Sequence, residues 1–246
     1  MENEQKLTKA QKRELRKQEW QQKVEADKKQ DQFKKIAMWV GAALVVILGI
    51  AGLAWMVNST PSATSETVSI APVSDKDITN SVKDAKITLF EYADFQCPAC
   101  ASYQPIIKQI LTEYEGKILF VYRNFPLTNV HKNAVISAQA GVAAHKQGRF
   151  FEMAEILYDR QKDWETVSDP TSLFIDYAKE LKFDINKFKN DLNSDDTKNF
   201  IKDSEKLAIS EGMNSTPTFV LNGIKIRGAN TLDDFKKLID NELNKK

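Results

Sequence analysis

The sequence predicts an α/β domain over about residues 84–246, preceded by one apolar helix, and three observations support this fold class. An apolar run from Ile87 to Phe95 leads into the chain's two cysteines, which stand together as Cys97-Pro98-Ala99-Cys100. A helical segment and a second apolar run follow, and a β-hairpin pattern appears near the C-terminus. The order strand, helix, strand predicts a parallel pair of strands joined by a right-handed crossover.

The first elements are predicted from apolar runs. Ile87 to Tyr92 has the continuous apolar character of a buried strand, and so does Lys117 to Arg123. The segment between them, Cys97 to Tyr114, is predicted to be a helix that Pro105 kinks.

A long helical region is expected next, over about residues 128–214, because apolar residues recur there at three- and four-residue spacings. The predicted helices are His131–Gln147, Phe150–Arg160, Ser172–Leu181, Asp184–Leu192 and Thr197–Glu211. Gly148 is expected to end the first of them, and Asp184, Asp195 and Asp196 are candidate N-caps.

A β-hairpin and a final helix complete the domain. Thr218–Leu221 and Ile224–Arg227 flank Asn222-Gly223, a dipeptide that favours a two-residue hairpin turn. Thr231 suits the N-cap of a last helix that extends to Leu243.

The N-terminal part contains a candidate membrane anchor, Ile36–Val57, an uncharged apolar run of 22 residues. As a helix it would be about 33 Å long, enough to cross a bilayer core of about 30 Å. Lys34 and Lys35 precede the run, and no lysine or arginine follows it until Lys76. The positive-inside rule therefore predicts a single-pass protein of the cell membrane, with a cytoplasmic N-terminus and an extracytoplasmic domain.

The anchor divides the rest of the N-terminal part into a tail and a spacer. Residues 1–35 carry a net charge of +4 and are expected to be a solvated cytoplasmic segment, with binding of lipid headgroups as a secondary expectation. Residues 58–83 are rich in Ser, Thr and Pro at their start and are predicted to be an extended spacer. The alternative to an anchor is a secretory signal cleaved near Ala63, although the 22-residue run exceeds a usual signal core.

The cysteine pair indicates thiol–disulfide chemistry. Two cysteines three residues apart can close and open a disulfide with little chain movement, and a cysteine at a helix N-terminus faces backbone N–H groups that stabilise its thiolate. A zinc site would have to use His131 and His145, whose spacing fits no known finger, and these histidines are expected on helix surfaces. A purely structural disulfide would close too short a loop to add much stability. Nucleic-acid binding is not expected, because no basic patch with interleaved aromatics occurs.

Three motifs together resemble the thioredoxin fold, and the helical insertion resembles its DsbA-type branch: the strand order, Phe95 to Cys100, and Ser215-Thr216-Pro217-Thr218-Phe219. The resemblance covers about residues 84–246 and implies an α/β thioredoxin-like fold with the helices inserted between the second strand and the hairpin. It implies a thiol:disulfide oxidoreductase that needs no cofactor or metal beyond its redox-active disulfide.

The resemblance also implies roles for individual residues. Cys97 would be the exposed nucleophile and Cys100 the buried resolving thiol, while Glu91 would be the buried acid that moves protons for Cys100. Pro217 would be a cis-proline beside the active site. The residues that flank these positions, Pro98, Ala99, Thr216 and Thr218, would contact the substrate.

One position departs from the family pattern. Ala99 stands where the best-known DsbA member has a histidine that helps to stabilise the thiolate. We therefore expect the pKa of Cys97 to be lowered, but not as far as about 5. The expected enzyme is an oxidase of moderate reduction potential.

The expected function is donation of the Cys97–Cys100 disulfide to exported, unfolded proteins. A quinone-linked, DsbB-like membrane protein would reoxidise the pair, and residues 36–57 would hold the domain at the bilayer. The alternatives are a disulfide reductase or isomerase, and a tethered chaperone or adaptor that binds polypeptides near Pro217 without redox chemistry.

Overall fold

The computed structural model describes residues 65–245, together with residues 20, 23, 38–39, 41 and 44–50. The chain divides into two units, Met1–Pro61 and Ser62–Lys246, and the second contains the α/β domain. Most of the predicted tail and most of the predicted anchor, Ile36–Val57, lie outside the described residues, although residues 44–50 are helical. None of the helices in the described part combines the length and the apolar character needed to cross a bilayer.

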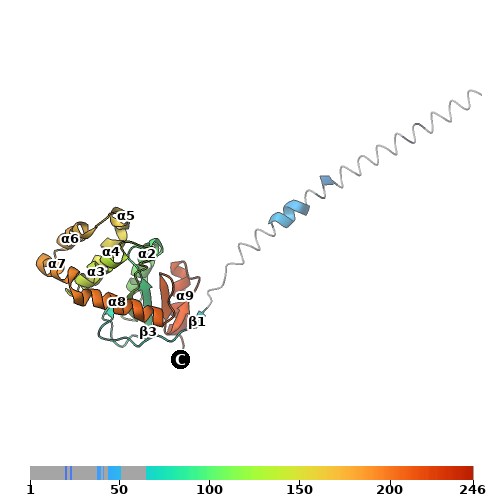
Figure 1. Ribbon diagram of the computed structural model, residues 1–246. Coiled ribbons are helices and arrows are strands. Elements are labelled where there is room, and N and C mark those ends of the chain that lie inside the picture. Colours follow the sequence, from blue (N-terminus) through green and yellow to red (C-terminus); the bar gives the residue numbers. More distant parts are fainter. Residues whose placement is uncertain are drawn as a thin grey trace, which may run out of the picture. The chain divides into compact units, whose positions relative to one another are not determined.

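A six-stranded sheet of order β1-β6-β5-β3-β4-β2 forms the centre of the domain (Figure 1). Its strands are β1 Ser65–Thr67, β2 Ile78–Thr79, β3 Ile87–Ala93, β4 Ile118–Asn124, β5 Thr218–Leu221 and β6 Ile224–Ile226. The pairing of β3 with β4 is parallel, as predicted, and the other pairings are antiparallel. Asn222 and Gly223 both have positive φ, at 48° and 81°, as the predicted two-residue turn between β5 and β6 requires.

Eight helices are described in the domain: α2 Pro98–Glu113, α3 Ala134–His145, α4 Phe150–Asp159, α5 Gln161–Trp164, α6 Thr171–Glu180, α7 Ile185–Asn193, α8 Asp195–Ser210 and α9 Leu232–Leu243. All the predicted helices are present, and α5 was not predicted. Asp184 caps α7 as expected, whereas the N-cap of α8 is Ser194, whose side chain accepts the Thr197 N–H. Asp195 and Asp196 instead occupy the first turn, where they face the positive end of the helix dipole.

The prediction that residues 58–83 form a spacer is wrong for the part that the structure describes. Ser65–Thr67 extends one edge of the sheet against β6, and Ile78, which is 1% exposed, pairs with β4 at the other edge. The folded domain therefore includes residues from Ser65 onward rather than from residue 84. These strands have only three and two residues, too few for a periodic pattern to show.

A buried ion cluster holds this N-terminal segment in place. The guanidinium of Arg123 on β4 donates to Asp77 and Glu211, at 2.9 and 3.0 Å, and to the Ala71 carbonyl at 3.1 Å. Glu211 in turn accepts the Ala71 N–H and the Tyr92 hydroxyl, both at 2.6 Å. Because several partners satisfy each charge, the cluster fastens residues 71–77 to the sheet and to the end of α8.

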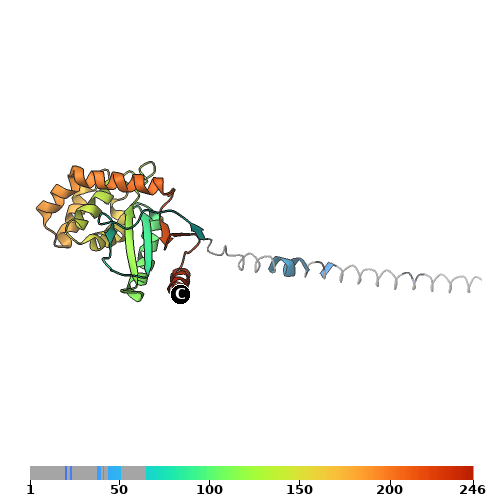
Figure 2. The same ribbon diagram turned by 90° about the horizontal axis from the view of Figure 1, so that it is seen from below.

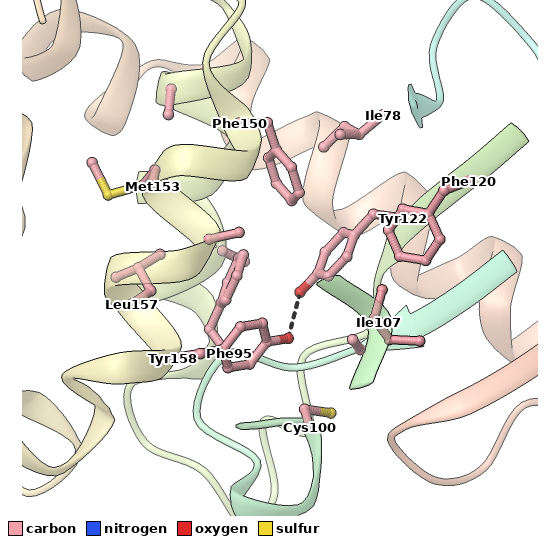
Figure 3. Packing of buried hydrophobic residues seen from close by; sticks show 14 of the residues in the cluster. Ile78, Phe95, Cys100, Ile107, Phe120, Tyr122, Phe150, Met153, Leu157 and Tyr158 are labelled. Carbon is pink, nitrogen blue, oxygen red and sulfur yellow. Dashed lines mark hydrogen bonds between the residues drawn. The ribbon is translucent and has the colours of Figure 1, made fainter. Parts of the chain in front are cut away.

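The two faces of the sheet are covered unequally, and Figure 2 shows α8 and α9 on opposite sides of the strands. The larger core lies between the sheet and helices that include α2, α4 and α9, and the smaller one lies under the end of α8. In the larger core, Phe95 packs against Tyr122 and Tyr158, whose hydroxyls are 3.1 Å apart, and Cys100 lies beside this aromatic cluster (Figure 3). Cys100 is therefore embedded in the core of the domain.

Candidate active site

The cysteine pair lies at the N-terminal end of α2, directly after β3. Cys97 is the N-cap residue, with extended backbone angles of −73° and 119°, and Cys100 lies in the first turn. Both are free thiols. Cys97 is 7% exposed and Cys100 is fully buried. Cys97 is thus the more accessible of the two, as predicted, but it is itself buried and not the exposed residue that was expected.

The surroundings of Cys97 favour its thiolate. Its pKa is lowered to about 5, chiefly by a hydrogen bond from the Cys100 side chain and also by the backbone N–H groups of Ala99 and Cys100. Burial acts in the opposite direction. The expectation that Ala99 would leave the Cys97 thiolate less stabilised is therefore wrong. The Cys100 thiol, followed by N–H groups of the first helical turn, lowers the pKa of Cys97 without a histidine at position 99.

The Thr216–Pro217 peptide bond is cis, as predicted, and lies against the nucleophile. The Cys97 thiol donates to the Thr216 carbonyl, with the sulfur 3.4 Å from the oxygen. Pro98 and Ala99 are exposed, and Thr216 and Pro217 are half-buried, so these four residues border the accessible side of the pair. Thr218 is different: it is 4% exposed and its hydroxyl donates to the Ser215 carbonyl at 2.7 Å. Its side chain shapes the cis-proline loop instead of facing a substrate.

Glu91 lies on β3, on the sheet face that also carries the core around Cys100. It is 3% exposed, and burial followed by the charge of Cys97 raises its pKa to about 8. Burial also raises the pKa of Cys100 well above its usual value. A cavity of about 480 Å³, lined mainly by side chains of α2 and α4, reaches Glu91 from the surface. Near neutral pH Glu91 is therefore an acid that still holds its proton, close to a thiol that resists losing its own.

Sequence reasoning missed the side chains that hold the active-site turn. Asp94, just before the turn, is 2% exposed; its carboxylate accepts the N–H groups of Gln96 and Leu127, each at 2.8 Å. The same carboxylate lies 2.8 Å from Nδ1 of His131. His131, expected on a surface, thus pairs with a buried acid and connects the loop after β4 to the turn. No local pattern marks this contact, because Leu127 and His131 lie more than 30 positions from Asp94.

No metal centre competes with this assignment in the part of the chain that is described. There, no group of three or more His, Cys, Asp or Glu side chains is arranged to hold an ion. The arrangement that does occur, a low-pKa thiol beside a cis-proline and a high-pKa thiol beneath it, can exchange disulfides and pass two electrons.

We predict that the Cys97 thiolate titrates with a midpoint near pH 5, followed by its ultraviolet absorbance or by its alkylation rate. Since the folded pKa lies below the unfolded value of about 8.5, this thiol adds nothing to the stability of the reduced fold below pH 5. Its contribution grows as pH rises and reaches about 3 kcal/mol at pH 7.

The corresponding measurement is denaturant unfolding of the reduced and the oxidised protein from about pH 4 to pH 8. The difference between the two stability curves reports mainly on the thiols, because Glu91 is buried in both forms and only the smaller effect of the Cys97 charge on it differs. A Cys97→Ser variant serves as the control and should lack the titration. A midpoint near 8.5 would contradict the prediction.

Comparison with known proteins agrees with this geometry. A family model described as Thioredoxin matches residues 74–241. Among curated proteins, the Na(+)/H(+) antiporter NhaA 3 of Salinispora tropica is 33% identical over 154 residues, which are 63% of this chain and 23% of that protein. NhaA 1 of Mycolicibacterium vanbaalenii is 35% identical over 156 residues, 63% of this chain and 24% of that protein. The chain thus spans about a quarter of the length of the curated relatives it matches.

Solved structures show the same fold. BdbD from Bacillus subtilis, in its oxidised form, superposes with a TM-score of 0.63 at 23% identity, covering 73% of this chain and all of that one. Alpha-DsbA1 from Wolbachia pipientis gives a TM-score of 0.60 at 24% identity, covering 69% of this chain and 92% of that one. The helical insertion predicted from the sequence is thus an insertion of the DsbA type.

Proposed function

Because this chain belongs to the thioredoxin family and is a thiol:disulfide oxidoreductase of the DsbA type, we propose that it works as a dithiol oxidase, donating its Cys97–Cys100 disulfide to exported proteins. The observation that supports this direction of electron flow is the contrast between the lowered pKa of Cys97 and the raised pKa of Cys100. A Cys97 thiolate stabilised to a pKa of about 5 favours the reduced form of the pair, and a pair that is stable when reduced is a strong acceptor of electrons.

The reaction proceeds in two exchanges. A substrate thiolate attacks Sγ of Cys97, the Cys97–Cys100 bond breaks, and Cys100 leaves with the electron pair. Glu91 then gives its proton to the departing Cys100 sulfur, because that thiolate is buried and its conjugate acid has a raised pKa. A second substrate thiolate attacks the substrate sulfur of the mixed disulfide and expels Cys97 as its stable thiolate. The substrate leaves with a disulfide, and the two electrons remain on the pair.

The substrate backbone is proposed to lie along the cis-proline loop. Thr216 and Pro217 border the nucleophile, and the Thr216 carbonyl already accepts the Cys97 thiol at 3.4 Å. That carbonyl becomes available when Cys97 enters a mixed disulfide, so an extended peptide can donate an N–H to it. Pro98 and Ala99, which follow Cys97 directly and are exposed, would contact the neighbouring substrate side chains.

We further propose that the domain works outside the cytoplasm, tethered by Ile36–Val57. The support is in the sequence: 22 uncharged residues preceded by Lys34 and Lys35, in a chain with a basic N-terminal tail. The partners would be unfolded exported proteins and a quinone-linked, DsbB-like membrane protein that reoxidises the pair. Tethering would raise the effective concentration of the domain near both.

The redox state of the pair in intact cells tests the direction. Acid quenching followed by alkylation fixes the thiols, and the chain's two cysteines make the mass shift unambiguous. An oxidase should be found mostly as the disulfide. A pair found mostly as the dithiol would contradict the proposal and favour a reductase or isomerase.

A further inference from the structure

A glutamine of the helical insertion reaches the backbone of the active-site turn. Gln161, the first residue of α5, is 4% exposed, and its amide nitrogen Nε2 donates to two carbonyl oxygens. It lies 2.7 Å from the Phe95 oxygen and 3.1 Å from the Cys97 oxygen. One amide group therefore bonds to the nucleophile's own carbonyl and to that of a residue two positions earlier.

Two further amides fix the position of this part of the insertion relative to the turn. Gln96 accepts the Asn133 N–H at 2.6 Å through its side-chain oxygen and donates to the Glu165 carbonyl at 2.8 Å. Asn133 donates to the carbonyls of Trp164 and Val167, at 3.0 and 2.9 Å. Both side chains are at most 8% exposed. The segment that contains Gln161 is thus bound to the turn at several points, and its amide has little freedom to turn away.

We propose that Gln161 is a positioning residue for disulfide exchange: through its hydrogen bonds to Phe95 and Cys97 it holds the turn so that the Cys97 sulfur faces the N–H groups of the first helical turn. Cys97 has the extended backbone angles of an N-cap residue, and the N–H groups of Ala99 and Cys100 act on its sulfur. That arrangement holds only while the Cys97 peptide keeps its orientation. The amide also places the positive end of its dipole against the Cys97 carbonyl oxygen. This inference rests on the proposed function, since it concerns how readily the pair accepts electrons.

A Gln161→Met variant removes both donors while keeping a side chain of similar length. We expect the equilibrium of the pair with glutathione to shift about tenfold toward the disulfide, which corresponds to about 30 mV. We also expect the midpoint of Cys97 alkylation to move upward by about one pH unit. Both are measured on the full chain.

The matched control is Gln147→Met. Gln147 also bridges two backbone groups of a distant segment, since it donates to the Asp184 carbonyl and accepts the Asp184 N–H, at 3.1 and 3.0 Å. Those bonds join the end of α3 to the start of α7 and do not involve the active-site turn. This variant should lose stability as Gln161→Met does, with the glutathione equilibrium and the alkylation midpoint unchanged.

A Gln161→Glu variant adds a pH readout and keeps the proposal testable if the methionine variant does not fold. The protonated carboxyl can still donate one hydrogen bond, whereas the carboxylate would face two carbonyl oxygens and repel the Cys97 thiolate. Its glutathione equilibrium should stay close to that of the unmodified protein at low pH and move toward the disulfide as the new carboxyl ionises.

The proposal is overturned if Gln161→Met changes stability alone, or if Gln161→Glu shows the pH profile of the unmodified protein. Either result would assign Gln161 a merely structural role. Both measurements are made on the purified full chain, so they do not depend on the redox state in cells. That redox state is the separate test of the direction of electron flow. Failure of one proposal is therefore distinguishable from failure of the other.

Discussion

A Cys100→Ser variant is expected to lose catalytic turnover and to accumulate mixed disulfides with its substrates. Cys97 keeps its position beside the cis-proline, and its thiolate can attack a disulfide of an exported protein, forming the mixed disulfide and releasing the other substrate sulfur as a thiolate. No Cys100 thiol remains to attack the Cys97 sulfur and release the substrate. The adducts should appear on non-reducing gels of cells that make the variant and should disappear on treatment with a dithiol. Because the chain has two cysteines, each adduct must be at Cys97.

The control is Cys97→Ser, which should form almost no adducts, because Cys100 is fully buried. Replacing both cysteines separates the oxidoreductase from a redox-independent adaptor: the adaptor would keep its activity, and the oxidoreductase loses it. Equal yields of adducts from the two single variants would contradict the assignment of Cys97 as the attacked atom.

A Glu91→Gln variant should slow the reduction of the Cys97–Cys100 disulfide by a dithiol by about 10²-fold at pH 7, the usual contribution of a positioned acid or base. The amide has the shape of the carboxyl but no proton to give to the departing Cys100 sulfur. Since the pKa of Glu91 is raised to about 8, the defect should be greatest below that pH. The rates of the two proteins should converge above it, where Glu91 is ionised in the unmodified protein as well.

Glu91 should also make the stability of the folded protein depend on pH. A carboxyl whose folded pKa is raised is stabilising below its unfolded pKa of about 4.3, and that contribution is lost as pH rises to about 8. The unmodified protein should thus lose a few kcal/mol over this range, and Glu91→Gln should not. Glu113→Gln, which alters a surface acid of α2 paired with Lys236, is the control and should change neither quantity. A rate defect that is constant across pH would remove the acid role from Glu91.

Much of the fold could be predicted because its signals are local. The runs Ile87–Tyr92 and Lys117–Arg123 each contain enough apolar residues to predict a strand, and Asn222-Gly223 specifies its own turn. The strands at the two edges were missed for the opposite reason. Ile78 and Thr79 are a strand because β4 lies beside them, and their segment is fixed by Arg123, some 46 positions from Asp77.

The same distinction applies to the active site. Cys97, Cys100, Glu91 and Pro217 were found by their fixed offsets and by the resemblance that those offsets support. Gln161 and Asn133 could not be found, because a buried amide is recognised by its partners, which here lie more than 30 positions away. The stabilisation of the Cys97 thiolate was underestimated for a related reason. The sequence shows that Ala99 replaces a histidine, but it does not show the hydrogen-bond donors that the folded turn brings to Cys97.

The central claim, that the pair is a disulfide donor, is tested most directly by its reduction potential, measured at equilibrium with glutathione buffers. A Cys97 pKa of about 5 lies between those of thioredoxin and DsbA, about 7 and 3.5, so the potential should lie between theirs, about −270 and −120 mV. We expect a value well above the lower limit, sufficient to oxidise exported proteins. A potential at or below about −270 mV would contradict this function and make the protein a reductase.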